Sequence, residues 1–218
     1  NSPYYGYARR ISTIRDAVVL LGFRAVRSAA LASCVIGTLR RSPNLDDEAF
    51  WRFSVATGMV AELLARTDRQ PHDHAFTAGI VHRLGLLALD HQRPDLLRSV
   101  LEQAATEGLP IVEAERRALG FTDAELGGAL MAHWNFPPAL VEAVQAQATP
   151  DTTTGLGGYV ARARVTARHW GLAEGIVVPA GTSGIGDLLP SLAPPLDPPG
   201  GVEGLLERVD AFLAAALV

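Results

Sequence analysis

The segment at residues 75–89 is apolar on nearly every side of the helix that its residue spacing predicts. A helix at the surface of a globular protein needs only one apolar stripe, so a helix that is apolar all round has to lie at the centre of a bundle. The same segment carries two adjacent polar residues, His82 and Arg83. Burying an arginine is costly unless its charge is paired, so we expect Arg83 either to form an ion pair or to extend its charged end to solvent.

Helical periodicity dominates the rest of the chain, and no convincing strand alternation occurs. A long helix is expected to begin at Asp46, and its buried face is expected to carry Phe50, Phe53, Thr57, Val60 and Leu64. The other expected helices cover residues 12–22, 23–41, 95–107, 111–119, 122–134, 138–147, 156–170 and 202–217. The spacing of Thr122 and Glu125 is that of a capping box, which predicts the start of one of these helices. We therefore predict an all-α fold, a compact multi-helix bundle.

The core of this bundle is expected to include Phe53, Val60, Ile80, Leu84, Leu87 and Trp134. Residues 175–201 differ in composition from the rest, because they contain six glycines and six prolines. Such a stretch is typical of loop structure, and an amphipathic helix follows it. We predict a loop-rich C-terminal region, residues 173–218, that packs on the same domain as residues 1–172.

The overall composition, 48% hydrophobic and 19% charged, is that of an ordinary globular protein. No apolar run approaches the roughly 20 residues that span a bilayer, and the first residues lack the basic and then apolar layout of a signal peptide. We expect a cytoplasmic location and no membrane partner. The single cysteine, Cys34, cannot form an internal disulfide and is expected to be a small buried residue.

All 19 basic residues are arginines, which GC-rich coding explains without any special arginine chemistry. Their placement is uneven, because residues 1–41 hold seven arginines against the single acidic residue Asp16. Such asymmetry can mark a surface that binds an acidic partner, and it is also typical of a solvated helix face. Under the first interpretation the partner-binding residues are Arg9, Arg10, Arg15, Arg40 and Arg41.

Several motifs occur in a fixed order along the chain. They are NSPYYG at residues 1–6, ISTIRDA at 11–17, LLG at 20–22, FTAGIVH at 76–82, Glu115 with GF at 120–121, and the run from Gly127 to WNFP at 134–137. In this order and at this spacing they resemble the HDOD family, the HD-related output domains of bacterial signalling proteins. The resemblance covers roughly residues 1–172 and implies an all-helical domain of HD-like topology. The family pattern begins several helices before Asn1, so its N-terminal helices are expected to be missing from this chain.

The resemblance also implies where metal ligands would lie in the wider HD superfamily, whose histidines and aspartates hold metals that activate water for phosphoester hydrolysis. At those positions this chain has Phe53, His82, Arg83, Asp123, Gln147, Ala148 and, near the last of them, Arg164. A catalytic zinc normally takes three protein ligands, and a guanidinium repels a cation. We therefore expect no metal, no other cofactor and no catalysis.

The polar residues that remain at these positions can form a ligand site or an ion-pair site made of His82, Arg83 and Asp123. Arg83 and Asp123 are expected to face each other as a partly buried ion pair that replaces the charge of the metal. His82 is expected to be a hydrogen-bonded residue of the core.

Three functions follow, the first of which we favour. The chain can be a non-catalytic output or scaffold module whose partners are other signalling proteins or domains, of the cyclic di-GMP or two-component pathways that the resemblance implies, or a second copy of itself. The alternative is a sensor that binds an anionic nucleotide or phosphate in the vestigial pocket. A metal-dependent phosphohydrolase is the third, which the ligand count argues against. No nucleic-acid partner is expected.

Overall fold

The computed structural model describes residues 43–70, 73–150, 154–177 and 196–216. These residues form the helices α3 (Asp47–Thr67), α4 (Ala75–Val81), α5 (Leu84–Gln92), α6 (Pro94–Glu107), α7 (Ile111–Leu119), α8 (Asp123–His133), α9 (Pro138–Gln145), a short 3₁₀ helix η2 (Ala146–Ala148), α10 (Gly155–His169) and α11 (Gly201–Ala216). Within the described ranges no β-strand is present, and Leu45 and Ile176 form an isolated β-bridge. The predicted all-α class is confirmed.

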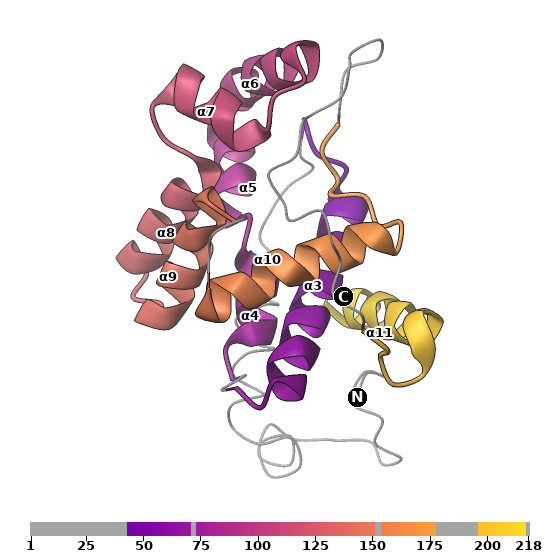
Figure 1. The fold of residues 1–218 in the computed structure, drawn as a ribbon. Helices are drawn as coiled ribbons and strands as arrows, with labels where there is room; N and C mark the ends of the chain where they lie inside the picture. The colour runs from indigo at the N-terminus through magenta and orange to yellow at the C-terminus, as the bar shows by residue number, and fades with distance from the viewer. Residues whose placement is uncertain (1–42, 71–72, 151–153, 178–195, 217–218) are drawn as a thin grey trace.

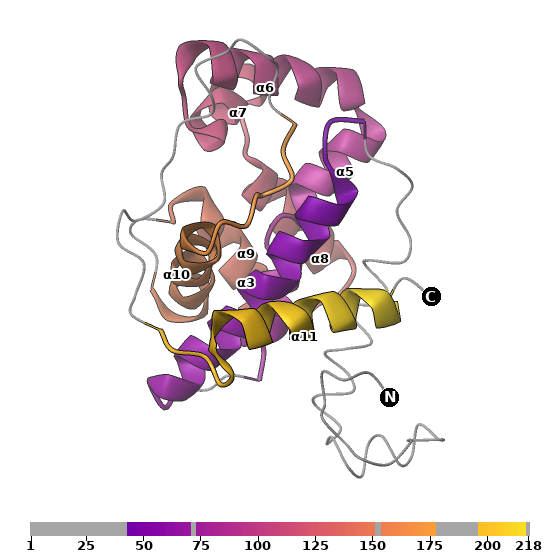
Figure 2. The same ribbon diagram turned by 90° about the vertical axis from the view of Figure 1, so that its right-hand side faces the viewer.

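Helix α3 lies in the middle of the molecule and packs against α4, α10 and α11 (Figure 1). It begins where the sequence predicts, because the side chain of Asp46 accepts a hydrogen bond of 3.1 Å from the backbone N–H of Ala49. The predicted inner face is buried throughout: Phe50, Phe53, Thr57, Val60 and Leu64. Figure 2 shows α11 lying across α3 on the side away from α8 and α9.

The expectation of one continuous helix over residues 75–89 is wrong. Helix α4 ends at Val81 and α5 begins at Leu84, with Arg83 at φ −115° and ψ 27° between them. The break lets each half pack closely on a different partner. Gly79 in α4 lies against Gly58 of α3, and Gly85 in α5 lies against the backbone of Asp123 and Gly127 in α8. Because both halves are equally apolar, the hydrophobic pattern does not reveal the break.

Helix α8 begins as predicted, since Thr122 and Glu125 form both hydrogen bonds of a capping box. Its end differs from the expectation, because it stops at His133 and the left-handed Asn135, with φ 56°, turns the chain. Trp134 therefore lies after the end of α8 and not on the buried face of that helix. Its expected place in the core is wrong, as the residue is 52% exposed.

The C-terminal helix α11 packs on α3 through Leu205, Val209 and Phe212, which are buried in the same core. The boundary proposed between residues 172 and 173 stays a prediction. The helices expected within residues 1–41, Cys34 and the arginines Arg9, Arg10, Arg15, Arg40 and Arg41 lie outside the described residues. None of the described helices is long and apolar enough to cross a membrane.

Candidate functional site

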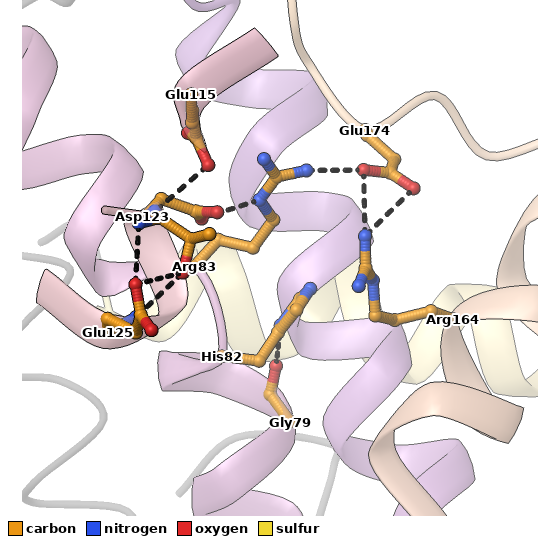
Figure 3. A network of polar contacts seen from close by, with 9 residues as sticks. Gly79, His82, Arg83, Glu115, Asp123, Glu125, Arg164 and Glu174 are labelled. Carbon is orange, nitrogen blue, oxygen red and sulfur yellow. Dashed lines mark hydrogen bonds and ion pairs between the residues drawn. The ribbon is translucent and has the colours of Figure 1, made fainter. Parts of the chain in front are cut away.

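The break between α4 and α5 places Arg83 in a buried network of charged side chains (Figure 3). Its Nε donates to Asp123 Oδ2 at 3.1 Å, and its Nη1 donates to Glu174 Oε2 at 2.8 Å. The Arg83 side chain is only 5% exposed. The predicted pair between Arg83 and Asp123 is therefore present, and the alternative that Arg83 extends to solvent is wrong.

Glu174 is the member of this network that the sequence interpretation missed. It follows α10 and also contacts Arg164 Nη2, at 3.4 and 3.5 Å, and Arg168 Nη1, at 3.8 Å. A signal for it does exist in the sequence. Three arginines in α10, at positions 162, 164 and 168, have no acidic residue near them in the chain except Glu174, which lies alone between Asp151 and Asp187. The buried Glu174 carboxylate, shared by Arg164 and Arg168, offsets part of this excess of positive charge.

Electrostatic interactions within the network favour the charged forms of Arg83 and Glu174. Burial alone would lower the pKa of Arg83, but the neighbouring Asp123 and Glu174 carboxylates raise it above its usual value. Burial would raise the pKa of Glu174, yet Arg164, Arg83 and Arg168 hold it at about 2. Burial also lowers the pKa of Arg164, which Glu174 only partly offsets. Since an arginine stays protonated in proteins, the two buried guanidinium groups of Arg83 and Arg164 face two carboxylates, and the exposed Arg168 adds a third positive charge at the edge.

The model of the HDOD domain family matches residues 1–150 of the chain. The chain belongs to this family. Among curated proteins, an uncharacterized protein of Treponema pallidum (strain Nichols) is 25% identical to this HDOD chain over 147 residues. The match covers 66% of this chain and 28% of that protein, so this chain spans less than a third of the length of this relative.

Solved structures share the fold. A candidate phosphohydrolase from Shewanella amazonensis SB2B matches with a TM-score of 0.71 at 24% identity, covering 99% of this chain and 81% of its own. An HDOD domain protein with unknown function from Geobacter sulfurreducens matches with a TM-score of 0.65 at 22% identity, covering 100% and 69%. A candidate signal transduction protein from Marinobacter aquaeolei VT8 matches with a TM-score of 0.64 at 24% identity, covering 99% and 49%. At these identities the likeness shows the HDOD fold alone.

The structure brings most of the would-be ligand positions of this HDOD chain together. The ring centroids of Phe53 and His82 lie 6.1 Å apart. Asp123 pairs directly with Arg83, and Glu174 links Arg83 to Arg164. Gln147 is not part of the ion network. Its Nε2 donates to the carbonyl oxygens of Ala143 and Gly157 and so connects η2 to α10. Ala148 is half-buried in η2.

His82 is buried, and its Nδ1 lies 2.6 Å from the carbonyl oxygen of Gly79. A carbonyl only accepts, so Nδ1 carries the proton and donates. Burial, with the nearby positive charge of Arg164, lowers the pKa of His82 well below 6.5, so the ring is neutral at pH 7. This agrees with the prediction of a hydrogen-bonded core histidine.

The donor set around His82 does not fit a divalent cation. The guanidinium groups of Arg83 and Arg164 lower the pKa of His82 by their charge and would repel a cation in the same way. Over the whole described part of the chain, no group of three or more His, Cys, Asp or Glu side chains is placed to hold a metal ion. We derive no metal-dependent step from these residues.

Glu115 adds a buried carboxyl group behind Asp123, and its Oε2 accepts a hydrogen bond of 3.0 Å from the backbone N–H of Asp123. Burial, and then the charge of Asp123, raise the pKa of Glu115 to about 9. Glu115 is therefore neutral at pH 7 and leaves the balance of two buried guanidinium groups and two carboxylates unchanged.

Replacing Glu115 by glutamine is expected to increase stability more as the pH rises. From the ordinary pKa of 4.5 up to about 9, the unfolded chain ionises Glu115 while the folded protein keeps it protonated, so stability falls through this window. Glu115→Gln removes that loss, and its amide oxygen can still accept from Asp123. Urea unfolding at about pH 5 and about pH 8 should show a variant-minus-parent difference in unfolding free energy that is larger at the higher pH. A difference that does not change with pH would contradict the assignment.

Proposed function

We propose that this HDOD chain is a non-catalytic signal-transduction module that acts through contacts with other proteins. The observation that carries the proposal is the identity of the side chains at the would-be ligand positions. The phenyl ring of Phe53 and the guanidinium groups of Arg83 and Arg164 lie there, and the arginines are held by Asp123 and Glu174. An ion network of this kind contributes to the fold at positions where a hydrolase would need a cation and an activated water.

The names of the structural neighbours support a signalling context without assigning a role to this chain. One neighbour is a candidate signal transduction protein and another a candidate phosphohydrolase, although a shared fold does not by itself transfer either activity. The expected partners remain other signalling proteins or domains, with a second copy of the chain as one of them. The cytoplasmic location also stays a prediction.

A second candidate function is a sensor for an anionic ligand at the vestigial site. Arg83 Nη2 and Arg164 Nε are buried nitrogen atoms that have no hydrogen-bond partner within the described part of the molecule. A buried donor without a partner costs free energy, and ligand oxygen atoms can supply the missing acceptors.

Complementation of a strain that lacks the full-length gene tests the proposed function. His82→Asn removes the one imidazole at the would-be ligand positions and is expected to restore signalling fully, because the proposal gives His82 no chemical role. We also propose that the basic segment contacts an acidic partner, so charge reversal of Arg9, Arg10, Arg40 and Arg41 to glutamate is expected to abolish partner recruitment in pull-downs. Loss of signalling in a folded His82→Asn variant would favour catalysis over contact.

A further inference from the structure

The two buried arginines hold a carboxylate that comes from outside the part of the chain matched by the family model. That match ends at residue 150, and Glu174 lies in a short segment, residues 172–177, that we call the strap. Figure 3 shows the Glu174 carboxylate reaching the guanidinium groups of Arg83 and Arg164 from one side. An arginine pair that closes on one carboxylate has the chemistry of an oxyanion-binding site.

Besides the contacts of Glu174, three backbone hydrogen bonds attach the strap to the bundle, one of them from the Leu172 N–H to Ala167 O at 3.1 Å, and Leu172 lies in the core. The backbone N–H of Asp46 donates to Gly175 O at 2.7 Å, and that of Val177 donates to Asn44 O at 3.1 Å. Gly175 has φ 75° and lies so close to the backbone of Phe50 that a side chain there would clash. The Glu174 side chain and the hydrogen bonds at Gly175 and Val177 therefore hold the same short stretch of backbone.

Glu174 does not satisfy all the donors that surround it. Its contact with Arg83 is short, at 2.8 Å, but those with Arg164 and Arg168 are longer, at 3.4 to 3.8 Å. The buried atoms Arg83 Nη2 and Arg164 Nε have no partner in the described residues. Both belong to side chains that are at least nine-tenths buried. A phosphate group has more acceptor oxygens than a carboxylate and could engage donors that Glu174 leaves free.

We propose that Arg83, Arg164 and Arg168 form an oxyanion-binding site that Glu174 occupies in cis, and that an external carboxylate or phosphate which takes the place of Glu174 releases the strap. This inference rests on the sensor candidate above and adds the identity of the competing group and of the element that moves. Arg168 is the most exposed of the three arginines and gives an entering anion its first contact.

Chemical rescue of Glu174→Ala tests the site. The variant is expected to melt about 5 °C or more below the parent, because it leaves buried guanidinium groups without their carboxylate. Sodium acetate or sodium phosphate should raise its melting temperature saturably, whereas sodium chloride at the same ionic strength should not. Saturation by acetate alone would indicate a carboxylate site, and tighter saturation by phosphate would indicate a phosphate site.

Two controls separate the site from a general salt effect. Glu174→Gln fills the space without the charge and should show little rescue, and Glu174→Ala combined with Arg164→Met should show none. Equal rescue in the double variant, or no saturable rescue of Glu174→Ala, would overturn the proposal and leave Glu174 as a structural ion-pair partner only.

The parent protein tests strap release even if Glu174→Ala does not fold. In excess phosphate or excess acetate, whichever anion binds, amide hydrogen exchange at Asp46 and Val177 should become severalfold faster than in chloride, because release of the strap breaks both hydrogen bonds. Exchange that stays unchanged in both anions would overturn strap release. These measurements use purified protein, so their failure would leave the contact function, which complementation tests, untouched.

Discussion

Arg83→Met is expected to lower the free energy of unfolding by about 3–5 kcal/mol, because it leaves Asp123 as a buried carboxylate without its partner. The double variant Arg83→Met with Asp123→Leu should lose much less than the sum of the two single changes, since it leaves neither charge of the pair alone. Denaturant unfolding of the parent, both single variants and the double variant measures the coupling between the two residues.

An exposed ion pair in the same protein supplies the matched control. Arg52 and Asp210 are 2.8 Å apart, closer than Arg83 and Asp123, but their side chains are 36% and 54% exposed. Arg52→Met should therefore cost only about 0–1 kcal/mol. If Arg83→Met costs no more than Arg52→Met, burial does not make the network important for stability.

Gly85→Ala is expected to destabilise the protein by about 3 kcal/mol or more, at the upper end of overpacking effects. A Cβ at residue 85 would fall inside contact distance of the carbonyl oxygen of Asp123 and the backbone N–H of Gly127. Backbone atoms cannot rotate away as a flexible side chain can, so α5 and α8 would have to separate. That separation would also pull Asp123 away from Arg83.

Gly204→Ala is the control for this change. A Cβ at residue 204 of α11 would meet nothing nearer than 3.8 Å, and alanine favours a helix over glycine by about 0.5–1 kcal/mol. Urea unfolding should show this control at or above the stability of the parent and Gly85→Ala far below it. Equal stability of the two variants would mean that the close approach of α5 to α8 is not required.

Much of the fold is predictable because helix starts are local. The cap at Asp46 and the capping box of Thr122 with Glu125 need only residues within one turn, and both are present. The break at His82 and Arg83 is not local. It depends on which helices Gly79 and Gly85 approach, and those partners lie at Gly58 and Asp123, distant in the sequence.

The candidate site likewise has one part that the sequence predicts and one part that depends on distant contacts. The pair between Arg83 and Asp123 could be predicted, because the family resemblance places both residues at ligand positions of one pocket. Glu174 could not be predicted in this way, because it lies beyond the matched region and in a segment without helical periodicity. Its role follows from the tertiary contact that brings residues 172–177 beside residues 44–46.

The most direct measurement is the metal content of the purified protein by elemental analysis, after equilibration with Mn²⁺, Fe²⁺ or Zn²⁺ and dialysis. The parent and His82→Asn are the pair to compare, because His82 is the one imidazole among the would-be ligands. With Arg83 and Arg164 beside it, we predict sub-stoichiometric metal in both proteins and no difference between them. Retention of about one metal ion per chain in the parent, lost in His82→Asn, would contradict the proposal that an ion network stands in place of a metal site.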